Sequence, residues 1–230
     1  SDLQAAGQIG LFDNRLRNSV QYTSPVFSNF SASALYSTGE NGVGPRAYNA
    51  NIGVKYDDGA WFAALAYTRS TTGADNNSAT SVSAFEKVSD LRAALTYRFS
   101  ANTRIGLMYD RTDGDLTRAG SLAYGGSDLK QSVWYVNGAL GIGDNGRIIA
   151  QYGQAGKLSG GNTTVADSGK ARHYTLGYEH DLSKRTLFKA IYSEIRNHRA
   201  ANYDFGIGSI GGVAAGADPR GFAVGLRHTF

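Results

Sequence analysis

Few side chains of this 230-residue chain could perform catalysis or hold a metal. It has no cysteine, which removes disulfides and thiolate ligands. His180 and Ser183 could suggest the Ser–His pair of a hydrolase, but Ser183 is the ordinary turn residue of Asp-Leu-Ser-Lys. We therefore predict that the protein is not an enzyme and has no cofactor, and changing Ser183 would test the hydrolase alternative. A helical zinc site needs two histidines four positions apart with a glutamate beside them, and the four histidines do not have this spacing. They are His173, His180, His198 and His228.

Basic residues alternate with apolar residues in several segments, and this spacing could select ions. In Leu91–Phe99 the apolar side chains occupy the odd positions, whereas Arg92, Thr96 and Arg98 occupy even positions. Successive side chains of a strand point to opposite faces, so the two arginines share one face. A charge held against lipid at mid-depth costs about 2–4 kcal/mol, so this face must meet water if the other meets lipid. A pore wall lined by such residues favours the entry of anions.

The last segment of the chain, Gly221–Phe230, alternates in the same way and ends on an aromatic residue. An unpaired apolar edge on a soluble domain invites aggregation, whereas a closed barrel in a membrane removes the edge and exposes apolar side chains to lipid. Glycine is abundant at 30 residues, and the mean hydropathy is only −0.32. No apolar run approaches the roughly 18 residues of a spanning helix, so membrane crossing would use strands. The net charge of +4 is too small and too scattered to indicate nucleic acid.

The lengths of the connections predict an all-β fold, an antiparallel transmembrane β-barrel in the bacterial outer membrane. Short turns such as Asp57–Gly59 alternate with long Gly-, Asn- and Ser-rich loops such as Ser70–Lys87. Short periplasmic turns and long external loops are typical of such barrels, whereas a soluble β-sandwich mixes its loop lengths. About eleven strands are expected, at Asn18–Ser24, Asn29–Ser37, Arg46–Tyr56, Ala60–Arg69, Val88–Phe99, Thr103–Asp110, Leu129–Ile142, Gly146–Gln154, Lys170–His180, Arg185–Glu194 and Pro219–Phe230.

The number of predicted strands is odd, whereas single-chain bacterial barrels have an even number. Ser1–Leu16 is loop-like and leads into the first predicted strand. We therefore expect the chain to be the C-terminal two thirds of a larger barrel. The alternative is that Leu3–Phe12 supplies a twelfth strand, although its alternation is poor.

Several segments resemble one family of proteins. Asn18–Pro25, the hairpin Tyr174–Thr186 and the ending Gly225–Phe230 are similar to the corresponding parts of Gram-negative general porins, closest to the neisserial and β-proteobacterial branch. The resemblance implies a 16-stranded homotrimer whose third loop folds inward and narrows the pore. Residues 1–17 would then be a remnant of that constriction loop, and residues 18–230 would be the sixth to the sixteenth strands with their connections. Phe230 would be the signal that the barrel-assembly machinery reads.

The predicted pore lining follows from the alternation. Asp2 and Asp13 would lie on the constriction loop, and Arg15 and Arg17 where that loop rejoins the wall. An alternative places Arg98, Arg104 and Arg147 at the periplasmic rim, where they meet solvent or headgroups. Arg15 and Arg17 share the predicted lining with Lys55, Arg92, Arg98, Arg104, Arg147, Glu179, Lys189 and Arg227. Seven strand cations against two acidic residues, Asp110 and Glu179, would favour anions.

The predicted function is passive diffusion of small anions and hydrophilic solutes through a water-filled outer-membrane channel. The alternative is a barrel that acts mainly as an adhesin or receptor through its external loops. Aromatic residues on the opposite parity are expected to face lipid and to form interfacial girdles, with packing at a trimer interface as the other interpretation. They are Trp61, Tyr67, Tyr97, Tyr109, Trp134, Tyr152, Tyr174, Tyr178, Tyr192, Phe222 and Phe230.

Overall fold

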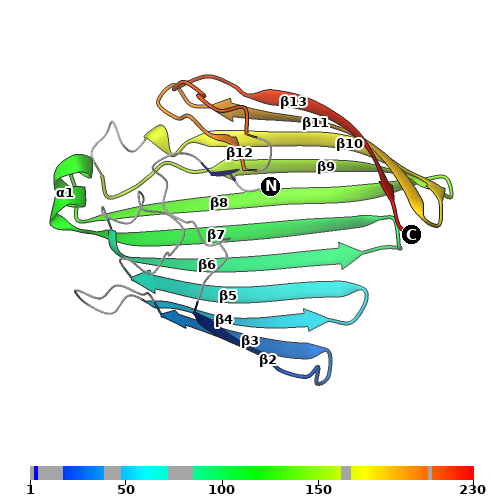
Figure 1. The fold of residues 1–230 in the computed structure, drawn as a ribbon, viewed down its shortest axis with the longest axis horizontal. Coiled ribbons are helices and arrows are strands. Elements are labelled where there is room, and N and C mark those ends of the chain that lie inside the picture. The colour runs from blue at the N-terminus through cyan, green and yellow to red at the C-terminus, as the bar shows by residue number, and fades with distance from the viewer. Residues whose placement is uncertain (1–2, 5–17, 39–47, 72–84, 162–166, 207–208) are drawn as a thin grey trace.

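A computed structural model describes residues 3–4, 18–38, 48–71, 85–161, 167–206 and 209–230. Eleven antiparallel strands form one sheet, and each strand pairs with its neighbours in the chain, in the order β13-β11-β10-β9-β8-β7-β6-β5-β4-β3-β2 (Figure 1). The strands are β2 (Ser19–Thr23), β3 (Phe30–Thr38), β4 (Tyr48–Asp57), β5 (Trp61–Thr71), β6 (Phe85–Arg98), β7 (Arg104–Leu116), β8 (Asp128–Ile142), β9 (Gly146–Ala155), β10 (Ala171–Ser183), β11 (Thr186–Asn197) and β13 (Arg220–His228).

The predicted all-β antiparallel class and its eleven strands are confirmed. The sheet is twisted and open, since β2 and β13 each pair with one neighbouring strand within the described residues (Figure 1). The described part of the alternative twelfth strand does not join this sheet. Leu3–Gln4 (β1) instead pairs with Asp204–Phe205 (β12), which lies in the connection before β13. Residues 5–17 lie outside the described part of the chain.

Short turns and long connections lie at opposite ends of the strands (Figure 1). The turn between β4 and β5 is held by the Asp58 carboxylate, which accepts hydrogen bonds from the backbone N–H groups of Ala60 at 2.9 Å and Trp61 at 2.6 Å. The hydrogen bond from Trp61 has the largest effect in lowering the pKa of Asp58, and the bond from Ala60 acts in the same direction. Gly59 adopts φ +92°, a left-handed conformation that favours glycine. The local turn chemistry therefore sets this hairpin.

The β6–β7 hairpin is longer than predicted, because β7 continues to Leu116 instead of ending at Asp110. Its last residues are polar, and ion pairs on one face stabilise them: Arg111 lies 3.2 Å from Asp113, and Lys87 of β6 pairs with Asp115. The outer-face positions of β7 beyond Asp110 are polar, so the sequence there lacks the apolar–polar alternation by which a strand is recognised. The sequence prediction therefore placed this part in a loop.

The connection from β7 to β8 contains a helix that the sequence prediction missed, α1 (Arg118–Tyr124). The Thr117 hydroxyl accepts a hydrogen bond from the Gly120 N–H at 3.1 Å, which caps the helix N-terminus. Gly125 ends the helix at φ +75°. A cap residue and a terminal glycine bracket the segment in the sequence, and this signal could have located it.

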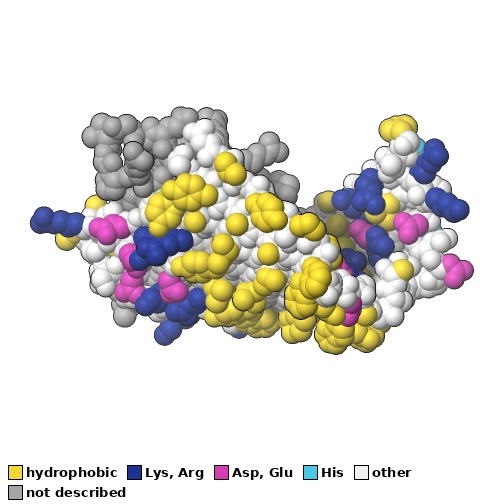
Figure 2. Space-filling model, turned by 90° about the horizontal axis from the view of Figure 1, so that it is seen from below, with side chains coloured by type: hydrophobic (Ala, Val, Ile, Leu, Met, Phe, Trp, Pro, Cys, Tyr) yellow, Lys and Arg dark blue, Asp and Glu magenta, His cyan; other side chains and the backbone are white. Residues whose placement is uncertain are grey.

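The two faces of the sheet differ in polarity. We call the parity that carries Leu91, Leu95 and Leu107 the outer face and the opposite parity the inner face. These leucines are 40%, 43% and 52% exposed. In Figure 2 hydrophobic side chains form a band over the sheet, and charged side chains gather toward the ends of the strands. The outer face also carries most of the strand aromatics, which pack in cross-strand pairs such as Trp61 with Tyr97, whose centroids are 4.6 Å apart.

Two clusters of buried apolar residues lie where the long connections fold over the inner face. Leu129 and Leu158 form one cluster with Phe85 and Leu116. Tyr203 and Ile195 belong to a second cluster, in which Tyr203 is 1% exposed. Burial raises the pKa of the Tyr203 hydroxyl. These clusters hold the ends of the long connections against β8 and its neighbours.

Candidate functional site

The strand register places the eight predicted strand residues of the pore lining on the inner face. Residues that lie directly opposite each other on neighbouring strands share a face of the sheet. Glu179 of β10 lies opposite both Arg147 of β9 and Lys189 of β11, so these three side chains share one face. On the other hairpins the same parity includes Lys55, Arg92, Arg98, Arg104 and Arg227. Whether these residues line a pore stays a prediction.

Arg147 and Glu179 form an ion pair across β9 and β10. Arg147 Nε donates to Glu179 Oε2 at 2.5 Å, and the two side chains are 24% and 17% exposed. Lys189, the other cross-strand neighbour of Glu179, makes no ion pair with a described residue. One carboxylate therefore lies beside two cations at this end of the sheet.

Two buried carboxylates lie in the middle of the inner face. Arg92 Nε donates to Asp110 Oδ2 at 2.7 Å, across β6 and β7. The Thr112 hydroxyl lies 2.9 Å from Asp90 Oδ1 and 3.3 Å from Asp110 Oδ1. Asp90 lies within the predicted strand Val88–Phe99, but the sequence-based assignment of faces covers only Leu91–Phe99 and therefore omits it.

Arg98 is paired as well. Its Nη1 and Nη2 atoms lie 2.7 Å and 3.2 Å from the two carboxylate oxygens of Asp57, the last residue of β4. The guanidinium also lies 5.8 Å from the centre of the Phe62 ring. The sequence prediction assigns Asp57 to a turn, whereas the structure places it at the end of β4 with the parity of Lys55. If the predicted strand Arg46–Tyr56 is extended by one residue, the two-residue period places Asp57 on the same face as Lys55.

The predicted ratio of seven strand cations to two acids was wrong, because Asp57, Asp90 and Asp181 also have inner-face parity. Arg92, Arg98 and Arg147 are each neutralised by a carboxylate. Four predicted cations make no ion pair with a residue that the structure describes. They lie toward the short-turn ends of their strands, and we call them the basic rim: Lys55, Arg104, Lys189 and Arg227.

The predicted constriction residues Asp2, Asp13, Arg15 and Arg17 lie outside the described residues. Of that segment, Leu3–Gln4 is described, and it pairs with β12.

β12 lies over the inner face. The Phe205 ring centre is 6.2 Å from that of His173 in β10, and the Tyr203 hydroxyl accepts a hydrogen bond from Gln131 Nε2 of β8 at 2.8 Å. Both His173 and Gln131 have inner-face parity. The β1–β12 ribbon therefore lies on the same side of the sheet as the charged residues.

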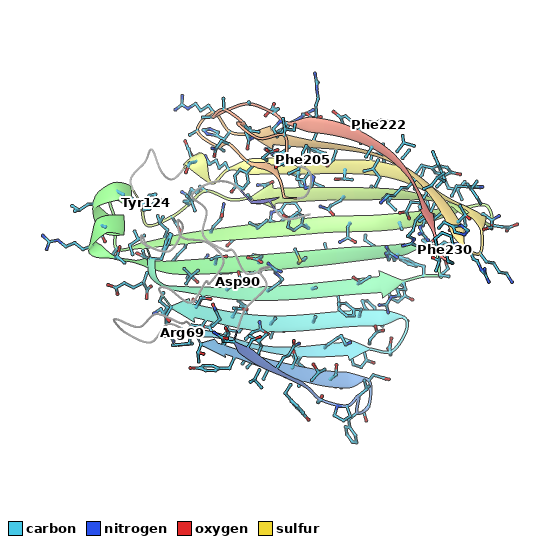
Figure 3. All side chains as sticks on the ribbon, in the orientation of Figure 1. Arg69, Asp90, Tyr124, Phe205, Phe222 and Phe230 are labelled. Atoms are coloured by element: carbon cyan, nitrogen blue, oxygen red, sulfur yellow. The ribbon has the colours of Figure 1, made fainter. Side chains whose placement is uncertain are left out.

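Phe230, the predicted assembly signal, follows β13 at the short-turn end, far from Tyr124 of α1 (Figure 3). Its ring packs against His228, with centroids 4.9 Å apart, and is otherwise exposed.

The residues considered for catalysis do not form a catalytic pair. Ser183 Oγ lies 3.1 Å from Thr186 Oγ1, and His180 Nδ1 lies 3.0 Å from the Tyr178 hydroxyl. Within the described ranges, no group of three or more metal-ligating side chains could hold an ion. The described part of the chain also has no helix long and apolar enough to cross a membrane.

Comparison with known proteins agrees with this architecture. Residues 2–200 match the family model described as Gram-negative porin. The chain is 29% identical over 235 residues to outer membrane porin protein 32 of Delftia acidovorans, and the match covers 98% of this chain and 60% of that protein. The chain thus spans about three fifths of the length of this curated relative.

Two solved structures share the fold. The anion-selective porin from Comamonas acidovorans superposes with a TM-score of 0.73 at 23% identity, over 94% of this chain and 60% of that one. A loop-deletion mutant of OmpT, an outer membrane protein of Vibrio cholerae, gives a TM-score of 0.59 at 15% identity, over 91% of this chain and 62% of its own. At these identities the likeness establishes the fold.

Proposed function

This chain belongs to the Gram-negative porin family, and from that premise we propose that it forms the wall of a water-filled diffusion channel in the bacterial outer membrane. The division of the sheet into two faces carries this proposal. Exposed leucines and aromatics occupy the outer face, whereas Arg92, Asp110 and Glu179 occupy the inner face. Lipid on one side and water on the other account for this distribution.

A closed wall requires partners for the edges of β2 and β13. Backbone N–H and C=O groups at an unpaired edge have no water to bond in the hydrocarbon region, so barrels in membranes close. We propose that further strand pairing satisfies both edges in the membrane and that the channel assembles as a homotrimer, as the resemblance to general porins implies.

We propose that the channel prefers anions. The basic rim supplies four cations that make no ion pair with a described carboxylate. A low-dielectric barrel concentrates the field of such charges in the lumen, so a small excess changes ion entry. The paired residues Arg92, Arg98 and Arg147 contribute less, because each has a carboxylate within 2.7 Å. Small hydrophilic solutes would cross down their gradients.

The segment 1–17 is proposed to narrow the channel. The contact of Leu3–Gln4 with β12, which lies over the inner face, supports an inward course for this segment. Arg15 and Arg17, with Asp2 and Asp13, would then set a transverse field at the narrowest point.

The test is the reversal potential of the purified protein in a planar bilayer under a salt gradient. Stable conductance steps with an anion-selective potential are expected. Changing Arg104 and Lys189 together to glutamine should move the potential toward zero, whereas the control Lys130→Gln, on the outer face beside Asp128, should not. The absence of conductance would contradict the channel. Cation-selective steps would contradict the charge assignment only.

A further inference from the structure

The two buried carboxyl groups in the middle of the inner face have one described guanidinium as their ion-pair partner (Figure 3). Asp90 of β6 and Asp110 of β7 are 4% and 9% exposed. Arg92 Nε donates to Asp110 at 2.7 Å, whereas Asp90 makes no ion pair with a residue that the structure describes. If both carboxyl groups were ionised, one negative charge would have no described counter-ion. Two carboxylates in one poorly hydrated site rarely ionise together, because each charge disfavours the other.

The strand register places no second described cation directly beside this pair. Asp90 lies opposite Thr112, and Arg92 lies opposite Asp110. The register neighbours on the far sides of the two strands, in β5 and β8, are all uncharged: Ala66, Thr68, Gln131 and Val133. Among the described residues at these positions, Arg92 is therefore the one cation that faces the two carboxyl groups.

The contacts of the Thr112 hydroxyl indicate a proton on one of the carboxyl groups. Its Oγ1 atom lies 2.9 Å from Asp90 Oδ1 and 3.3 Å from Asp110 Oδ1. A hydroxyl has one hydrogen, so it donates to one of these two oxygens. An ionised carboxylate only accepts, so the second contact is a hydrogen bond when a protonated carboxyl group donates to Oγ1. One shared proton therefore satisfies both contacts and removes the uncompensated charge.

The pair lies where its charge can act on ions in the proposed channel. Its bonded partner Arg92 has inner-face parity, and the Arg92 side chain is 33% exposed. Salt screens a buried charge less than an exposed one, and a low-dielectric wall concentrates the field of that charge in the lumen. The gain or loss of one proton at this site therefore changes ion entry.

We propose that Asp90 and Asp110 hold one proton between them in acidic to neutral solution, and that this shared proton sets how strongly the channel prefers anions. With the proton bound, Arg92 balances the one remaining carboxylate, and the basic rim determines selectivity. When the proton leaves in alkaline solution, a second negative charge stays on the inner face and the preference for anions falls. This inference rests on the proposed diffusion channel and assigns the residues that make its selectivity depend on pH.

Infrared spectroscopy of the purified full chain in detergent tests the shared proton, because it detects protonated carboxyl groups and needs no conduction. Spectra are recorded from about pH 6 to about pH 9, a range in which ordinary aspartates are ionised and lysines are charged. The unchanged protein should show a carboxylic acid band that disappears across this range. Asp90→Asn should lack the band. The matched control Asp113→Asn, on the outer face of β7 and paired with Arg111, should keep it.

The reversal potential in planar bilayers over the same pH range tests the effect on selectivity. The anion-to-cation permeability ratio of the unchanged protein should fall by roughly half or more as the pH rises, because each chain gains one negative charge. Asp90→Asn should remove most of this change, whereas Asp113→Asn should behave like the unchanged protein. Titration of His173, which also has inner-face parity, would persist in all three proteins, so the difference between them measures Asp90.

Two results would overturn the proposal. The same carboxylic acid band in Asp90→Asn would place the proton elsewhere, and an equal pH dependence of the permeability ratio in that variant would separate the pair from selectivity. Asp110→Asn is the second variant: it leaves Arg92 to Asp90, so the band should disappear at lower pH. The absence of conductance steps would contradict the channel itself, while the infrared band would still decide whether the proton is shared. Circular dichroism, with an unchanged β-sheet spectrum, separates a lost band from lost folding.

Discussion

Changing Tyr203 to phenylalanine removes one hydroxyl from the buried contact that holds the β12 connection on the inner face. The hydroxyl donates to the Gly169 carbonyl at 2.7 Å and accepts from Gln131 Nε2 at 2.8 Å. Two buried bonds contribute about 0.5–1.5 kcal/mol each. Part of this loss is recovered, because Gln131 Nε2 also reaches the Gly169 carbonyl at 2.9 Å. We expect about 1–2 kcal/mol less local stability.

Hydrogen exchange measures this change at individual amides. A loss of 1–2 kcal/mol corresponds to roughly 5- to 30-fold faster exchange through local opening. The acceleration should appear in residues 198–206, while β8 and β10 exchange as before. Tyr152→Phe is the control, because its hydroxyl bonds Gln154 at 2.9 Å on the outer face. Unchanged exchange in residues 198–206, or equal acceleration in the control, would refute the assignment of Tyr203 as the anchor.

Three further outcomes are expected. Glu179→Gln removes the partner of Arg147, so the reversal potential should become more anion-selective; an unchanged value would place this pair away from the ion path. Leu95→Arg puts a charge on the outer face at a cost of about 2–4 kcal/mol and should lower the folded fraction in vesicles, whereas Thr96→Arg on the inner face should not. Phe230→Ala should reduce the amount of folded protein in outer membranes if Phe230 is the assembly signal; equal amounts would contradict that role.

Much of the fold could be predicted, because its signals are local. Alternation in segments such as Leu91–Phe99 reports which side chains share a face, whatever the rest of the chain does. Turn residues such as Asp58 and Gly59 mark the ends of the strands. The prediction failed where local signals stop: β7 beyond Asp110 is polar on its outer face, and only the ion pairs of the assembled sheet extend it.

The sequence by itself determined the all-β class, the strands of the sheet and the face of the charged residues within each recognised alternating segment, since a two-residue period needs no partner. Only the tertiary structure decided which charges are neutralised. Arg92 finds Asp110, Arg98 finds Asp57 and Arg147 finds Glu179 through cross-strand register, which joins residues 18 to 41 positions apart in the chain. The same register sets Arg172 of β10 against Arg196 of β11. Coulomb energy depends on distance in space, and no one-dimensional pattern contains that distance.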